Sequence, residues 1–377
     1  MPSPDKILED SLQIAQSNLD QPIITNEAIL ERVRYVARCL TNRSGVRMLI
    51  TCALAKIHRP SVDIRKPYTE IGGPDVFSGR NDYDEAYIWP FASKYGLPVN
   101  STTAFLTPGF RTMNVPLAPP LAISGRPKRM YSNTIQLLDD THQGKLTPQD
   151  LLSETLRQLL ILKQEQEVRM QQLLEELRTS QNSIPLSSED IASLIEQHLR
   201  SPKSSRLPVL VVAAAYKAAA DRLREYPKPL YSHTAADQQT GALGDVEITL
   251  VDDDQVVTCY EMKAKEVTKE DIDLAINKLA NAGIRVDNYI FVTTETIEKD
   301  VAEYAASLYK ETEGIEFTIL DCLGFLRHFL HLFHRLRLAF LDAYQEFLLS
   351  EPDSAVSQPL KELFLALRRA AEIDSSA

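Results

Sequence analysis

Apolar residues recur at helical spacing along the first sixty residues of the chain. This periodicity predicts helices over residues 4–60, interrupted at Gly45, and Asn26 stands where an N-cap is needed before "EAIL". Residues 61–135 then change character, because they are rich in Pro, Gly, Tyr and Asn and show little periodicity. They predict a long irregular region with some short strands, and loops of this length are uncommon unless they are functional.

Two helices are predicted in the middle of the chain. Residues 147–180 show a long amphipathic pattern, in which Thr147 is the expected cap and Pro148 takes the first position. A shorter helix follows, with Ser188 as its expected N-cap. The long helix is either a dimer seam or a spacer packed on its own domain, and the pattern favours neither.

From about residue 205 the pattern alternates between helices and short apolar strands. Runs such as "YIFV" are typical of strands that are buried on both faces. Thr268 is the expected N-cap of the helix after the second strand, and Gly283 ends that helix. The expected order is helix, strand, strand, helix, strand, helix, strand, over residues 207–226, 245–251, 255–264, 268–283, 286–295, 296–312 and 315–321, with helices from 323 onward.

The distribution of charge along the chain bears on whether the protein binds nucleic acid. The net charge of -11 taken alone argues against nucleic acid as a partner, but the charge is uneven. Between Arg32 and Lys66 the only acid among many Lys and Arg residues is Asp63, and further basic clusters occupy 124–131 and 200–206. Local patches of positive charge, rather than the net charge, decide whether a protein binds phosphate, so the sequence still allows a nucleic-acid partner.

The expected location is the cytoplasm, without a membrane partner. No apolar run reaches the roughly 18 residues that a membrane helix needs. The first residues, "MPSPDKILEDSLQIAQS", are polar and acidic, which does not fit a secretory signal. Four scattered cysteines without a CxxC spacing are typical of free thiols in a reducing compartment.

Two predicted strands carry charged residues inside otherwise apolar sequence. In "GALGDVEITLVDDDQVVTCYEMKAK", Asp245 and Glu247 lie two apart, as do Glu261 and Lys263. Side chains two apart share a strand face, so a hairpin can bring Asp245 close to Glu261 and Lys263. Two carboxylates and an ammonium group on a half-buried surface are costly without a purpose.

A divalent cation relieves that cost. Mg²⁺ prefers carboxylate, carbonyl and water oxygens, and a lysine beside it can orient or deprotonate a water, helped by a pKa that burial lowers. This is the equipment for hydrolysing a phosphodiester with a metal-activated water. The alternative is an ion pair between Asp245, Glu261 and Lys263 on an exposed sheet face.

This region resembles the PD-(D/E)XK nuclease core, whose order is αβββαβ. Gly244–Asp245 stands in place of the family's proline–aspartate pair. The resemblance implies that Asp245 and Glu261 ligate Mg²⁺ with the Met262 carbonyl, and that Lys263 serves the attacking water. It also implies an acid on the preceding helix, for which Glu225 is the candidate, and Glu247 is a supporting alternative.

Longer stretches resemble the SacI family of type II restriction endonucleases. They are "RKPYTEIGG…FSGRNDYDEAYI" at 65–88, "FLTPGFRTMN" at 105–114 and "SSRLPVLVVAAAY" at 204–216. The resemblance implies Mg²⁺-dependent cleavage of double-stranded DNA at a short palindrome, together with a protective methyltransferase in the same system. A palindrome is normally read by a two-fold symmetric homodimer, which we therefore expect.

Candidate DNA contacts come from basic and amide side chains on irregular backbone. Phosphates suit cations and hydroxyls ahead of a helix, whereas Arg suits guanine, Asn suits adenine and an acid suits the cytosine amino group. Any one of these residues could instead stabilise a loop. The candidates are Arg65, Lys66, Glu70, Arg80, Asn81, Asp84, Arg111, Asn114, Lys203, Ser204, Ser205 and Arg206.

The predicted fold class is α/β (α+β), a mixed central sheet flanked by helices, with a largely helical and irregular N-terminal region. We expect a DNA-recognition region over 1–135, a linker or dimerisation segment over 136–203, the nuclease core over 204–350 and a helical tail over 351–377, whose last stretch, 366–377, is expected to fray. Two other functions stay open: a repair or defence nuclease that is not a restriction enzyme, and a catalytically silent DNA-binding module. The chain has no P-loop sequence, which favours an enzyme that works without ATP.

Overall fold

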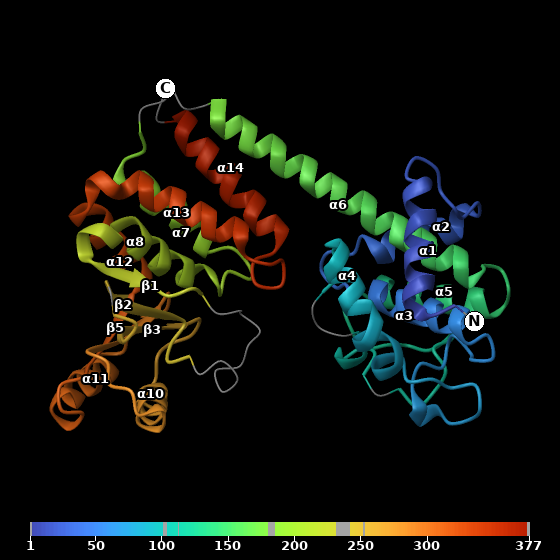
Figure 1. Ribbon diagram of the computed structural model, residues 1–377, viewed down its shortest axis with the longest axis horizontal. Helices are drawn as coiled ribbons and strands as arrows, with labels where there is room; N and C mark the ends of the chain where they lie inside the picture. Colours follow the sequence, from blue (N-terminus) through green and yellow to red (C-terminus); the bar gives the residue numbers. More distant parts are fainter. Residues whose placement is uncertain are drawn as a thin grey trace. The chain divides into compact units, whose positions relative to one another are not determined.

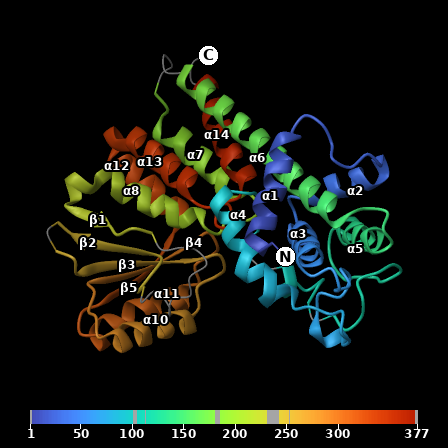
Figure 2. The ribbon, with the colours of Figure 1, turned by 45° about the vertical axis from the view of Figure 1, so that its right-hand side comes forward.

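The structure is a computed structural model, which describes residues 2–100, 104–111, 113–179, 185–230, 242–251 and 253–374. The chain divides into two compact units, Met1–Arg169 and Met170–Ala377, called unit 1 and unit 2 below. The boundary falls inside one long helix, α6 (Pro148–Thr179) (Figures 1 and 2).

Unit 1 is helical and is built around one apolar core. Asn26 caps the second helix as predicted, because its side chain accepts from the N–H groups of Ala28 and Ile29. The described part of residues 61–135 contains turns and short helices and no strand, which corrects the expectation of short strands. The elements are α1 (Pro4–Ser17), α2 (Glu27–Ala37), α3 (Ser44–His58), η1 (Thr69–Ile71), the π-helix η2 (Arg80–Ile88), α4 (Trp89–Tyr95), η3 (Ala104–Leu106) and α5 (Lys128–His142).

The predicted break at Gly45 is wrong. Gly45 lies inside α3, and the chain leaves the helical path before it, over residues 38–43. Its lack of a side chain serves packing, since a Cβ there would come within 2.7 Å of Thr134 Oγ1 on α5. A glycine at a close helix–helix contact therefore imitates a helix break in the sequence pattern.

The helix α6 begins as predicted and contributes to the cores of both units. The Thr147 hydroxyl accepts from the N–H of Asp150 at 3.0 Å. Leu residues of its first half are buried in unit 1, and those of its last turns pack against the core of unit 2. Much of its apolar face is thus used within this chain, and the segment 136–203 forms no unit of its own.

Helix α7 (Ser188–Leu199) begins one residue earlier than predicted. Ser187 is the N-cap and forms a capping box with Asp190, whereas the Ser188 hydroxyl donates to the carbonyl of Leu330 at 3.1 Å. Adjacent serines both satisfy the sequence signature, so only the backbone decides between them.

Unit 2 contains one mixed sheet of five strands between two layers of helices (Figures 1 and 2), which confirms the predicted fold class. The strands follow each other in chain order, antiparallel from β1 to β3 and parallel from β3 to β5. They are β1 (Glu225–Pro227), β2 (Val246–Leu250), β3 (Val256–Lys263), β4 (Asn288–Thr293) and β5 (Glu316–Asp321).

The helices on the two faces of this sheet belong to different apolar clusters. One face is covered by α7 and α8 (Leu207–Leu223), with α12 (Cys322–Leu332), η4 (His334–Leu336), α13 (Arg337–Ser350) and α14 (Gln358–Asp374). The other face is covered by α10 (Lys269–Ala282) and α11 (Lys299–Glu311). The order α8–β1–β2–β3–α10–β4 reproduces the expected αβββαβ series, because the short strand β1 supplies the missing member.

The last helix is part of the core of unit 2. Phe364 and Leu365 of α14 are fully buried, and Phe364 packs against the ring of Tyr344. The expected region 351–377 is therefore helical, as predicted, and packed over its described residues.

A buried histidine beside α14 makes the stability of the protein dependent on pH. His198 is fully buried, with Nδ1 at 2.9 Å from the Tyr344 hydroxyl and Nε2 at 3.0 Å from the Leu360 carbonyl. Burial lowers the pKa of His198 to about 4. Its folded pKa lies below its unfolded pKa, so the neutral ring stabilises the fold fully above pH 6.5. This contribution is lost progressively as the pH falls toward 4.

We expect the free energy of unfolding to fall by up to roughly 3 kcal/mol between pH 7 and pH 4 on account of this ring. Urea titrations at several pH values measure it. His198→Gln keeps a donor and an acceptor but cannot charge, so its stability should vary less over this range. His328→Gln, at an exposed position of α12, is the matched control and should leave the slope unchanged. Equal slopes for wild type and His198→Gln would contradict the assignment.

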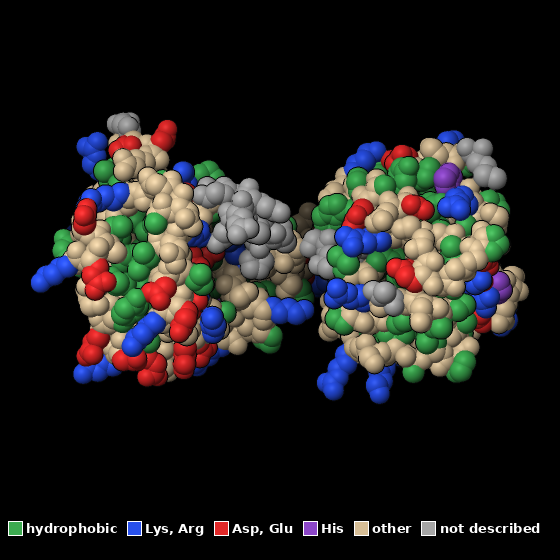
Figure 3. Space-filling model, turned by 90° about the horizontal axis from the view of Figure 1, so that it is seen from below, with side chains coloured by type: hydrophobic (Ala, Val, Ile, Leu, Met, Phe, Trp, Pro, Cys, Tyr) green, Lys and Arg blue, Asp and Glu red, His purple; other side chains and the backbone are tan. Residues whose placement is uncertain are grey.

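Charged side chains are distributed unevenly over the surface. Acidic residues gather on the exposed faces of α10 and α11, among them Glu270, Asp273, Asp300 and Glu303, and this face of unit 2 is turned to the viewer in Figure 3. Part of the net negative charge therefore lies on these helices. Within the described residues, no helix combines the length and the apolar character needed to cross a membrane.

Candidate active site

The strands β2 and β3 bring Asp245 to the end of β3. Because they are antiparallel, the start of β2 lies beside the end of β3. The N–H of Asp245 donates to the Tyr260 carbonyl at 2.7 Å, and its carboxylate Oδ2 accepts from the N–H of Met262 at 2.7 Å. Asp245 is thus bonded to the backbone on either side of Glu261, through its N–H to Tyr260 and through its carboxylate to Met262.

Gly244 permits this close approach of the two strands. A Cβ at residue 244 would come within 2.6 Å of the Tyr260 carbonyl oxygen. A proline, as in the PD-(D/E)XK pattern, would carry such a Cβ and could not occupy this backbone without a shift. The replacement of the pattern's proline by Gly244 therefore has a steric reason.

Glu261 and Lys263 lie on the same face of β3, the one that α10 and α11 cover. Their strand neighbour Cys259 belongs to the apolar cluster of these helices, whereas Tyr260 belongs to the cluster of the opposite face. The Lys263 ammonium group lies 3.1 Å from Glu261 Oε1. Both side chains are about one fifth exposed, so the site is half-buried and open to solvent.

The Tyr289 hydroxyl connects Glu261 to the segment that leads into β2. It lies 3.0 Å from Glu261 Oε2 and 2.9 Å from the Leu243 carbonyl. Burial raises the pKa of Tyr289, and the negative charges of Glu261 and Asp245 raise it further. Because Asp245 is bonded to the backbone on either side of Glu261, and Glu261 contacts Lys263, the three residues lie at the same end of β3.

Two residues of α10 complete the surroundings, and neither was assigned to the site from the sequence. Asp271 Oδ1 lies 3.2 Å from the Lys263 ammonium group, and Lys278 lies 4.0 Å from Glu261 Oε2. Asp271 also closes the capping box with Thr268. Its place in the first turn of a capped helix was visible, but its contact with Lys263 depends on how α10 packs on the sheet.

The pKa of Lys263 differs from the expectation of a lowered value. Burial by itself lowers this pKa, but the carboxylates of Glu261 and Asp271 reverse the effect, so the pKa lies above its usual value. Lys263 consequently carries its charge at neutral pH. This favours orientation of a water or charge stabilisation over removal of a proton.

The donor set fits a hard divalent cation. Asp245 and Glu261 offer carboxylate oxygens, and the Met262 carbonyl points to the same strand edge as its N–H, which Asp245 binds. Mg²⁺ typically takes one or two carboxylates and keeps several waters. Among the described residues, no three His, Cys, Asp or Glu side chains form a metal cluster, so a cation here would rely on the carbonyl, waters and substrate phosphate.

Glu225 and Glu247 lie elsewhere. Glu225 begins β1 and is not on the preceding helix, and it pairs with Leu250 at the end of β2 that is remote from Asp245. Glu247 is buried, accepts from the N–H of Leu243 at 2.6 Å and lies 3.4 Å from the Lys228 ammonium group. Glu225 is therefore not placed as a ligand, and Glu247 supports the strand start.

Four of the candidate DNA contacts are held in internal ion pairs that bury most of the side chain. Arg65 bridges Asp63 and Asp139, and Lys66 pairs with Asp75. The other two, Asp84 and Arg206, are buried, and the sequence alone does not tell a buried charged residue from an exposed one. Asp84 pairs with Arg47 at 2.9 Å, and Arg206 pairs with Glu351 at 2.8 Å. Because their charged groups are buried in these pairs, Asp84 and Arg206 are not available for the expected contacts with DNA.

The other eight candidates keep part of their side chains at the surface. Lys203 and Ser205 are exposed ahead of α8, whereas the Ser204 hydroxyl donates to the Leu199 carbonyl at 2.6 Å. Asn114 is exposed. The remaining four, Glu70, Arg80, Asn81 and Arg111, line one pocket of unit 1.

Residues 183–294 match the family model of the SacI restriction endonuclease C-terminal domain. The matched segment spans α7 to β4 and contains Asp245, Glu261 and Lys263. The mixed sheet and this match together support a restriction-type nuclease, a class of hydrolases that bind DNA.

More particularly, this segment is similar to the C-terminal domain of the SacI restriction endonuclease, which bears out the resemblance seen in the sequence for the part of the chain that contains 204–216. A search of curated proteins gave no match.

Proposed function

We propose that the protein is a type II restriction endonuclease that hydrolyses phosphodiester bonds of double-stranded DNA at a short palindromic site. The observation that supports this best is the convergence of Asp245, Glu261 and Lys263 at the end of β3, inside the SacI-like segment. We assign the chemistry to the PD-(D/E)XK type with Mg²⁺.

Each of the three side chains has a role in this proposal. Mg²⁺, when bound, supplies Lewis-acid activation of a water and neutralises charge on the phosphate. Asp245 and Glu261, with the Met262 carbonyl, hold the ion. Lys263 carries a positive charge, hydrogen-bonds to the attacking water or phosphate and stabilises the added negative charge. Asp271 and Glu261 keep its ammonium group in place.

The proposal also covers the oligomeric state, the cellular location and the partner enzyme of the protein. A palindrome has two equivalent strands, so a homodimer with one active site per strand suits the reaction. Sedimentation should show a dimer, and a monomer both with and without DNA would contradict this. A cytoplasmic location and a protective DNA methyltransferase that is not a stable subunit belong to the same proposal.

One experiment tests the whole assignment. Purified protein is incubated with phage or plasmid DNA and MgCl₂, and the fragment ends are sequenced. We expect discrete ends at one palindrome and no cleavage when EDTA removes the metal. Ends without a common sequence would instead favour a repair or defence nuclease, and intact DNA bound by the protein would favour a silent DNA-binding module.

A further inference from the structure

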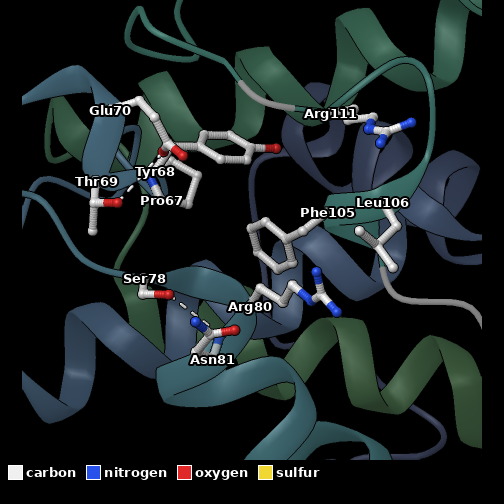
Figure 4. A pocket seen from close by; sticks show the side chains of 10 residues that line it. All are labelled: Pro67, Tyr68, Thr69, Glu70, Ser78, Arg80, Asn81, Phe105, Leu106 and Arg111. Carbon is white, nitrogen blue, oxygen red and sulfur yellow. Dashed lines mark hydrogen bonds between the residues drawn. The ribbon is translucent and has the colours of Figure 1, made fainter.

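Three separate segments of unit 1 build a notch of about 330 Å³ (Figure 4). They are residues 67–70, 78–81 and 105–111, and the four exposed base-reading candidates Glu70, Arg80, Asn81 and Arg111 all lie on its rim. Their convergence is a property of the fold, since more than forty sequence positions separate Glu70 from Arg111.

The floor of the notch is apolar and well supported. The rings of Tyr68 and Phe105 pack edge to face, with centroids 5.6 Å apart, and the Tyr68 hydroxyl donates to the Phe110 carbonyl. The N–H of Gly79 donates to the Pro67 carbonyl at 2.9 Å. A Cβ at Gly79 would overlap the Phe105 ring, so the glycine lets these segments meet.

The rim presents charges of both signs. Arg80 Nε donates to Glu85 Oε1 at 2.6 Å, so this ion pair holds the guanidinium group by one edge and its Nη groups form the other edge. Figure 4 shows Glu70 on the opposite side of the notch. A bare phosphate fits this rim poorly, because Glu70 would repel it, whereas a rim that offers both a donor fork and a carboxylate matches a group with both acceptors and a donor.

We propose that this notch reads one G·C base pair of the DNA through its major-groove edge. Arg80 donates to guanine O6 and N7, and Glu70 accepts from the cytosine amino group. Guanine is the base whose edge offers two adjacent acceptors to an arginine fork, and cytosine supplies the amino donor. This inference rests on the proposed function, because it needs a DNA substrate, and it places base reading in unit 1, apart from the residues that carry the chemistry.

The test uses the wild-type cut site, determined from fragment ends, in a fluorescent duplex whose binding is measured by anisotropy with Ca²⁺ in place of Mg²⁺. Each guanine is replaced in turn by 7-deazaguanine, which lacks the N7 acceptor. We expect one position at which the replacement weakens wild-type binding roughly 10- to 100-fold. Arg80→Ala should bind the unmodified duplex with a similar loss and show no added loss at that position.

A second set of measurements, which combines a base analogue with a Glu70 variant, tests the role of Glu70. Replacing the partner cytosine by pyrimidin-2-one removes the amino donor, and this change should likewise add nothing in Glu70→Ala. Arg80→Lys keeps the charge without the fork, so it should bind more weakly than wild type if Arg80 reads a base and as wild type if it contacts only phosphate. Lys6→Ala and Asp10→Ala, at an exposed ion pair on α1, are matched controls. Thermal melting confirms that each variant is folded.

The outcomes separate the two levels of the assignment. Additive effects at every position, or wild-type behaviour of Arg80→Lys, would overturn the notch as a base reader while cleavage at a palindrome still supports the endonuclease. Cleavage without any base preference would also overturn this inference. Wild-type protein that neither binds nor cleaves DNA would overturn the proposed function together with it.

Discussion

Lys263→Ala is expected to lower the rate of DNA cleavage roughly 100- to 10,000-fold and to leave DNA binding largely intact. The ammonium group lies 3.1 Å from Glu261 Oε1 and 3.2 Å from Asp271 Oδ1, so its loss removes the positive charge at the proposed phosphate site. Single-turnover cleavage with Mg²⁺ and anisotropy with Ca²⁺ measure the two effects separately.

Lys265 offers a matched control for this variant. It lies two residues further on, is more exposed and pairs with the other oxygen of the same Asp271 at 3.6 Å. Lys265→Ala should therefore change cleavage little, whereas Asp245→Ala should impair it as severely as Lys263→Ala. Equal impairment of the Lys263 and Lys265 variants, or cleavage by Lys263→Ala at the wild-type rate, would contradict the proposed role of Lys263.

Asp84→Ala is expected to destabilise unit 1 by about 3–5 kcal/mol, because it leaves the buried guanidinium group of Arg47 without its partner. Arg47 and Asp84 are both almost fully buried, and the two groups are 2.9 Å apart. The Thr51 hydroxyl and the Asn100 carbonyl complete the surroundings of the pair. Denaturant unfolding measures the loss directly.

Asp82→Ala is the control for this prediction. Asp82 is two residues away, half-exposed, and 3.8 Å from Arg59, so its removal should cost less than about 1 kcal/mol. If Asp84 read a base, its variant would fold with normal stability and change only the sequence preference. That result would restore the role expected from the sequence and refute the structural one.

Periodicity and capping signals predicted most of the elements that form unit 2. Thr268 and Gly283 delimit α10 as expected, and both strands of the charged hairpin were located. The strand β1 was missed because three residues show no alternation, and Glu225 was consequently assigned to the helix before it. A short strand is defined by its partner β2, which no local pattern reveals.

The triad of the candidate site could be predicted because strand geometry relates residues that are close in sequence. Asp271 and Lys278 could not, since their contacts depend on the packing of α10 against the sheet. Burial was equally hidden: Arg206 and Arg80 both stand at the start of a helix, yet Arg206 is buried against Glu351 and Arg80 is exposed at a notch.

The packing of α14 bears on where a stable fragment of this protein can begin and end. The family match stops at residue 294, before β5 and the helices α12 to α14. A fragment cut at that boundary would lose the edge strand beside β4 and leave His198 in contact with water. Expression trials of the catalytic part should therefore retain the chain through residue 374.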